Sequence, residues 1–243
     1  MSDREIVMAL PAGNFVENTE CGNVLEGAIL GYRDELKKDP NWRQGVTYVQ
    51  LWNEIDQLLV YQRTKMGGEG RLHGNLSIGF GGHVNEIDVT SKEMWDRFFT
   101  ENPDATWPQP VDLTRAVMAM SMSAIRELRE ELGIDIGYEH LRRNFDDVLD
   151  VPILDNDSEV GRIHVGSAAY VNVQSTYEFN PSPDCSIKGW VDVTRLITDR
   201  EAVEAEFGAK FEPWSVEVLK RIRIVRERNA ARPEPIETAE SAE

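Results

Sequence analysis

Three glutamates dominate residues 126–134, a segment that reads Arg-Glu-Leu-Arg-Glu-Glu-Leu-Gly-Ile. Glu127, Glu130 and Glu131 stand at positions i, i+3 and i+4, which are neighbours on the surface of a helix. Like charges at this spacing destabilise a helix unless something neutralises them, and a divalent cation would do so. Gly133 suits the left-handed conformation just past a last turn. The segment therefore predicts a helix that ends at Gly133 and holds a metal ion.

The other side of this helix is expected to pack against the protein. Its apolar residues recur at helical spacing, and they are Met118, Met122, Ile125, Leu128 and Leu132. One side of the helix would then be buried while the opposite side displays the carboxylates. An ordinary solvated acidic helix is the alternative interpretation.

The segment resembles the second half of the Nudix box, the signature of hydrolases that cleave a nucleoside diphosphate linked to another group. Every fixed position of that half, from Arg126 to Ile134, is filled. The resemblance implies an α+β fold, in which an α/β/α sandwich surrounds a mixed β-sheet. It also implies that the three glutamates are metal ligands, with Glu130 and Glu131 favoured as direct ligands. Arg126 is expected to pair with one of these carboxylates rather than to touch substrate.

A glycine loop supplies the first half of the box, with two departures from the family pattern. The loop contains Gly79, Gly81 and Gly82, and the position six after the last glycine is Asp88 instead of glutamate. Asp88 keeps the carboxylate, so the resemblance places it and Gly82 with the metal ligands. The second departure is an insertion at residues 89–113, which is structurally inexpensive in a loop. Residues 61–83 resemble a less-studied, phosphoesterase-like branch of the family.

Basic residues flank the glycine loop and could reach a diphosphate group. Arg63, Lys65 and Arg71 are the candidates, with solvated loop charges as the alternative for each. His83 follows the glycines directly and either contacts phosphate or packs the loop. The predicted substrate-binding set is Gly81, Gly82, His83, Arg63 and Arg71.

Many relatives use one more acidic residue, from a late loop before a strand that contains tryptophan. Asp184, six residues before Trp190, is the expected counterpart here, and Glu178 is the substitute. His164 lies in an apolar run that predicts a strand, so it is interpreted as a core histidine.

Composition excludes several other classes of protein. The chain has 243 residues and a formal net charge of −17, which argues against binding duplex nucleic acid without excluding a nucleotide. No apolar run approaches the ~18 residues of a membrane span, and the first residues lack a secretory signal, so a cytoplasmic location is expected. Cys21 and Cys185 are far apart and predict plain thiols.

The remaining elements are predicted from local patterns. Residues 46–52 and 57–63 predict a hairpin, residues 162–173 and 186–191 predict strands, and residues 212–227 predict a helix. Further helices are expected within residues 23–36 and from Ser91, which is suited to an N-cap. The expected organisation is an N-terminal extension at 1–45, a Nudix domain at 46–228 and a disordered acidic tail at 229–243.

The resemblance implies a reaction in which water attacks one phosphorus of a P–O–P linkage. Mg²⁺, with Mn²⁺ as the substitute, is the expected cofactor, because hard cations prefer carboxylate and phosphate oxygens. The expected substrate is a small nucleoside diphosphate derivative, and a homodimer is compatible with the resemblance. Two alternatives stay open, a non-catalytic Nudix-fold module that binds a nucleotide and isomerase chemistry on a diphosphate ester.

Overall fold

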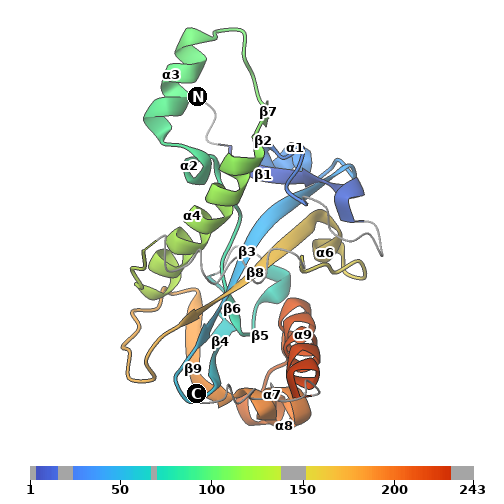
Figure 1. The fold of residues 1–243 in the computed structure, drawn as a ribbon, viewed down its shortest axis with the longest axis vertical. Helices are drawn as coiled ribbons and strands as arrows, with labels where there is room; N and C mark the ends of the chain where they lie inside the picture. The colour runs from blue at the N-terminus through green and yellow to red at the C-terminus, as the bar shows by residue number, and fades with distance from the viewer. Residues whose placement is uncertain (1–3, 16–23, 67–69, 138–151, 231–243) are drawn as a thin grey trace, which may run out of the picture.

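The computed structural model describes residues 4–15, 24–66, 70–137 and 152–230 (Figure 1). The strands are β1 (Ile6–Pro11), β2 (Ile29–Tyr32), β3 (Trp42–Trp52), β4 (Gln57–Arg63), β5 (Leu76–Ser77), β6 (Gly79–Phe80), β7 (Gln109–Pro110), β8 (His164–Asn172) and β9 (Cys185–Asp192). The α-helices are α1 (Arg33–Leu36), α2 (Glu86–Val89), α3 (Lys92–Glu101), α4 (Leu113–Leu132), α6 (Glu159–Ile163), α7 (Val193–Thr198), α8 (Arg200–Phe207) and α9 (Pro213–Ala230). Two short 3₁₀ helices span Ala12–Phe15 and Gly70–Leu72.

Strand β3 is the centre of a mixed sheet. It runs parallel to β8 along its length and antiparallel to β1 and β6. The predicted hairpin joins β3 to β4 through a turn in which Asn53 Oδ1 accepts the backbone N–H groups of Ile55 and Gln57. The two strands then diverge after the single pair Trp52 and Leu58, and β4 continues as the antiparallel partner of β9 and β5. The α+β class and the mixed sheet that we predicted are confirmed.

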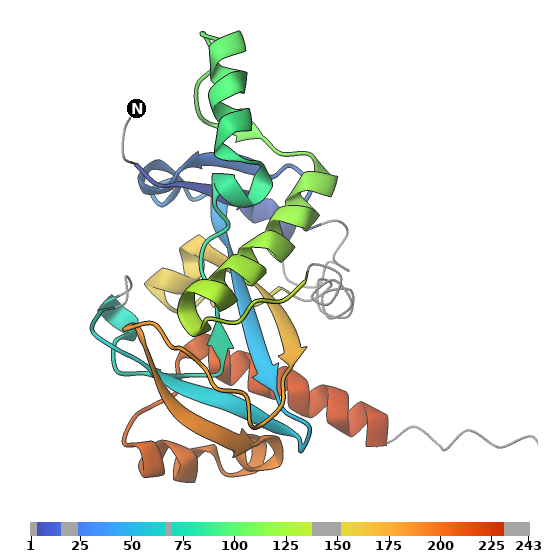
Figure 2. The ribbon, with the colours of Figure 1, turned by 90° about the vertical axis from the view of Figure 1, so that its left-hand side faces the viewer.

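The central strands are buried on both faces, which explains their nearly continuous apolar sequences. Successive side chains of a strand point to opposite faces. Val49 and Leu51 of β3 join the core beneath α4, whereas Tyr48 joins the core beneath α7, α8 and α9. In β4, Leu59 packs on the α4 side and Leu58 on the opposite side. The result is the sandwich visible in Figures 1 and 2, with α4 on one face of the sheet and α9 on the other.

Two local expectations are confirmed only in part. Of the helix expected within residues 23–36, the structure has the single turn α1, which ends at Leu36 as predicted, whereas Ile29–Tyr32 form strand β2 in an antiparallel pair with β1. Met118 and Met122 are 48% and 42% exposed, although they were expected to pack. The buried stripe of α4 instead includes three alanines, Ala116, Ala119 and Ala124, whose small side chains let the helix lie close to the sheet.

The insertion contributes α3 and β7 to an arm that begins with the preceding helix α2. Figure 2 shows α3 standing out from the rest of the molecule, beyond the beginning of α4. The helix expected from Ser91 is confirmed, since the Ser91 side chain accepts the Met94 N–H. Trp95 and Trp107 pack on each other at 5.1 Å between ring centroids and on the edge of the core. The arm returns to the sheet where β7 pairs with β2.

Other predictions concern features that the structure covers only in part. Cys185 is buried and carries a free thiol, whereas Cys21 lies outside the described residues. Residues 231–243 of the expected tail also lie outside them. Among the described residues, no helix combines the length and the apolar character that crossing a membrane requires.

Candidate active site

The glycine loop is pressed against β3 at the place where it leaves β6. Gly81 has a φ of +151°, and a Cβ atom there would lie 2.0 Å from the Thr47 carbonyl oxygen. Backbone hydrogen bonds fix the loop on both sides of this contact, from Thr47 N–H to the Gly82 carbonyl and from Val84 N–H to the Gly45 carbonyl, each at 3.0 Å. A glycine is therefore required at position 81 by both conformation and space.

Gly81→Ala is expected to lower the free energy of unfolding by about 3 kcal/mol or more, because the new methyl group meets backbone that cannot yield. Gly13→Ala is the matched control, since nothing lies within 4 Å of its Cβ position. Urea unfolding of both variants measures the difference. Equal stabilities of the two variants would contradict the close approach of the loop to β3.

Helix α4 brings its carboxylates to this loop across the intervening insertion. The Asp112 side chain accepts the Arg115 N–H at the beginning of the helix, and Gly133 ends it with a φ of +70°, as predicted. Gly81 N–H donates to Glu131 Oε2 at 3.1 Å. Glu127 Oε1 lies 2.5 Å from the point that a Cβ atom on Gly82 would occupy. The two halves of the sequence motif therefore meet in space.

Arg126 organises the acidic side of the helix. Its Nε and Nη2 donate to the two oxygens of Asp88, each at 2.9 Å, and its Nη1 donates to Glu127 at 2.7 Å and to Glu130 at 3.2 Å. Asp88 is 3% exposed in its side chain and also accepts the Asn85 N–H at 2.8 Å. Asp88 is thus an ion-pair partner of Arg126, and its role as a metal ligand stays a prediction. Arg126 pairs with carboxylates, as we expected.

Burial alters the protonation of the two carboxylates nearest the loop. Desolvation raises the pKa of Glu131 to about 8, with a further contribution from the negative charge of Glu127, while the charge of Arg63 acts in the opposite direction. Desolvation also raises the pKa of Glu127. A neighbouring cation stabilises the charged form of a carboxylate, so the buried carboxylates of Glu127 and Glu131 favour a bound positive charge.

The donor chemistry fits a hard divalent cation. Glu127 and Glu131 bring carboxylate oxygens to the loop at Gly82 and Gly81, the ligand type that Mg²⁺ and Mn²⁺ prefer, while the Gly82 carbonyl accepts the Thr47 N–H. The Glu130 side chain is 59% exposed and pairs with Arg126. Within the described part of the chain, no group of three or more His, Cys, Asp or Glu side chains is arranged to hold a metal ion. The glutamates therefore fit the cation by their chemistry, with Glu130 directed elsewhere.

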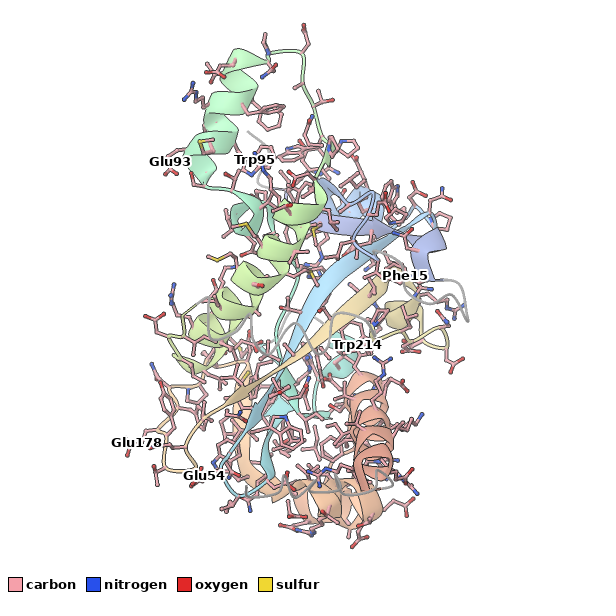
Figure 3. All side chains as sticks on the ribbon, viewed as in Figure 1. Phe15, Glu54, Glu93, Trp95, Glu178 and Trp214 are labelled. Carbon is pink, nitrogen blue, oxygen red and sulfur yellow. The ribbon has the colours of Figure 1, made fainter. Side chains whose placement is uncertain are left out.

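A pocket of about 500 Å³ opens beside the loop and extends toward α6 and the beginning of α9. The pocket is lined by all five residues of the predicted substrate-binding set, which are Gly81, Gly82, His83, Arg63 and Arg71. Of the helix glutamates, Glu131 lines it. Asp184 also lines it, whereas Glu178 is exposed on the loop between β8 and β9, at the outer edge of the molecule (Figure 3). Lys65 is not among the lining residues.

Two histidines form part of the pocket wall. The Nε2 atoms of His83 and His164 lie 3.1 Å apart, and the His164 Nδ1 lies 2.7 Å from the Val160 carbonyl. The Val160 carbonyl can only accept, so His164 donates from Nδ1 and accepts from His83 at Nε2 when both rings are neutral. Desolvation lowers the pKa of His83 well below its ordinary value, which keeps that ring neutral. His164 is buried, as expected of a core histidine.

The beginning of α9 contributes a wall of the pocket that no sequence pattern predicted. Glu212, Pro213 and Trp214 line the pocket from the beginning of this helix. Figure 3 places Trp214 there, beside β8, where Gly166 leaves room for the indole. The periodicity of residues 212–227 predicted a helix, but only long-range packing shows which of its residues reach the glycine loop.

Comparisons with known proteins agree with this architecture. No family model matches the chain. It is 24% identical over 209 residues to Protein YmaB of Bacillus subtilis (strain 168), and the match covers 84% of each chain. The crystal structure of Tm1382, a candidate Nudix hydrolase, superposes with a TM-score of 0.57 at 18% identity, covering 91% of this chain and 100% of that one. The chain therefore has the fold of the Nudix superfamily.

Proposed function

We propose that the protein hydrolyses a diphosphate linkage in a nucleoside diphosphate derivative, with Mg²⁺ or Mn²⁺ as cofactor. One observation carries this proposal: the glycine loop contacts Glu127 and Glu131 at the edge of a pocket that also contains arginine side chains. Phosphoryl transfer depends mainly on positioning and on electrostatic stabilisation of oxygen atoms, and this arrangement supplies both.

Glu127, Glu131 and Gly82 are the residues that would hold the cation. A bound divalent cation neutralises phosphate charge and acidifies a coordinated water molecule. Arg126 orients Glu127 through its 2.7 Å hydrogen bond and is itself fixed by Asp88. The proton of the attacking water passes to one of the glutamates or to Asp184, which lines the pocket. Arg63 and Arg71 provide donors for phosphate oxygens.

Purified protein incubated with and without Mg²⁺ should cleave one class of substrate in a panel read by mass spectrometry. The panel contains ADP-ribose, sugar nucleotides, dinucleoside polyphosphates, nicotinamide dinucleotide and nucleoside triphosphates. Glu131→Gln is expected to lose the activity. Glu93→Gln is the matched control, because this residue is exposed on α3, away from the pocket (Figure 3), and it should retain full activity.

Each outcome distinguishes between the candidate functions. Metal-dependent cleavage that disappears in Glu131→Gln supports the hydrolase. Thermal shifts on ligand binding, without turnover of any compound, would instead identify a nucleotide-binding module of the same fold. Activity that survives in Glu131→Gln would exclude the site described above.

A further inference from the structure

A buried polar cluster joins the beginning of α9 to the pocket. Glu212 is almost fully buried, and its carboxylate has three donors. Its Oε1 accepts from the Tyr48 hydroxyl at 2.9 Å and from the Ser77 hydroxyl at 2.6 Å, while its Oε2 accepts from Arg63 Nε at 2.8 Å. A buried carboxylate is stable only when it is paired and hydrogen-bonded in this way. Glu212 therefore has a fixed position and holds Arg63.

The contact with Glu212 leaves the other end of the guanidinium group available. Among the described residues, no hydrogen bond or ion pair engages the terminal nitrogens of Arg63, which lines the pocket together with Glu131. No ion pair joins Arg63 to Glu131 in this part of the chain, although its charge acts electrostatically on that carboxylate. A guanidinium fixed through Nε presents its two Nη groups as a flat fork, which matches two oxygens of a phosphate group.

The same cluster supports the approach to the glycine loop. The Tyr61 hydroxyl donates to the Gly79 carbonyl at 2.9 Å, and Ser77 Oγ accepts the Gly79 N–H at 3.2 Å. Ser215, one turn into α9, accepts the Ile78 N–H at 3.2 Å. The beginning of α9 is therefore connected both to Arg63 and to the segment that precedes Gly81.

We propose that Glu212 is a positioning residue for this site: it holds Arg63 through Nε and thereby aims the terminal nitrogens at a diphosphate group bound beside Glu131. The identity of that anion rests on the proposed function. Since Glu212 already balances the charge of Arg63, the arginine contributes directed hydrogen bonds more than net attraction. The direction of the guanidinium, and hence Glu212, should then decide how tightly the anion binds.

Glu212→Gln tests this with little change of shape. The glutamine oxygen can still accept from Tyr48 and Ser77, but its NH₂ group faces Arg63 Nε–H, and two donors repel each other. The probe is methylenediphosphonate, which is not hydrolysed, titrated by calorimetry in the presence of Mg²⁺. Glu212→Gln and Arg63→Ala are each expected to weaken binding roughly tenfold, the loss expected for a charge-assisted contact. In the Arg63→Ala background, Glu212→Gln should have no further effect.

Glu217→Gln is the matched control, because Glu217 lies on the same helix, pairs with Lys220 and Arg221 and does not line the pocket; it should bind the probe as the wild type does. The NMR signal of Arg63 Nε–H provides a readout that a purely structural role would not change. The signal should be protected from exchange in the wild type and in Glu217→Gln, and lost or shifted in Glu212→Gln. Glu212→Asp, which keeps the buried charge, should restore part of the binding and serves as the test variant if Glu212→Gln does not fold.

Failure of this inference can be told apart from failure of the proposed function. Wild-type protein that does not bind the probe, wild-type affinity in Glu212→Gln, or equal weakening with and without Arg63 would overturn the positioning role. The expected binding pattern without hydrolysis of any compound would leave the positioning role standing and remove the proposed activity. Hydrolysis by the wild type, combined with wild-type probe binding in Glu212→Gln, would support the proposed activity and overturn the positioning role.

Discussion

Glu131→Gln is expected to abolish hydrolysis and, without divalent cations, to make the protein harder to unfold above pH 7. Burial raises the pKa of Glu131 from 4.5 to about 8 in the folded protein. Below pH 4.5 the carboxyl is protonated in both states and has no effect on stability. Between pH 4.5 and 8 the unfolded chain releases the proton while the folded protein keeps it, so stability falls as the pH rises. Glutamine does not titrate, so the variant does not lose stability in this pH range for this reason.

The gain should reach about 2–4 kcal/mol near pH 8 and be close to zero at pH 4.5. Urea unfolding at several pH values with a chelator present measures it. Glu130→Gln is the matched control, because its side chain is exposed, and it should change stability little. Activity should fall on the order of 10²–10⁴-fold in Glu131→Gln. A stability gain in this variant that did not grow with pH would contradict the burial of an ionisable carboxylate at this position.

Arg126→Met is expected to destabilise the protein by about 3–5 kcal/mol, because it leaves the Asp88 carboxylate buried without its guanidinium partner. Arg129→Met is the matched control on the same helix. Arg129 pairs with Asp135, and both side chains are exposed, so its loss should cost no more than about 1 kcal/mol.

Denaturant unfolding of the two variants gives the comparison. Adding Asp88→Asn to Arg126→Met should recover part of the loss, since the buried charge is then removed. Equal stabilities for Arg126→Met and Arg129→Met would show that Asp88 does not depend on Arg126.

Features specified by neighbouring residues were predictable from the sequence. The helix that carries Glu127, Glu130 and Glu131 and ends at Gly133 follows from spacing and from the conformation that glycine allows. The hairpin of β3 and β4 follows from two apolar runs around a polar turn. The five residues predicted to bind substrate lie in the glycine loop or flank it in sequence, and all of them line one pocket.

Features that depend on contacts between distant segments were missed. The pairing of β2 with β1 limits the helix expected within residues 23–36 to the single turn α1, and strand pairing between segments is not visible in local spacing. Met118 and Met122 are larger and more apolar than the alanines of α4, yet closeness to the sheet selects the small side chains. Glu212 would have been found only by asking which acidic residue could neutralise Arg63, a question that sequence distance hides.

The pairing of β7 with β2 connects the arm to the N-terminal strands. The N-terminal strands supply the sheet edge on which the arm returns, and the arm in turn covers that edge. Unpaired edges invite association with other chains, so shortening either part exposes a surface that the other was protecting. The two parts therefore form one structural unit, and a change of length in either one alters the sheet edge that both share.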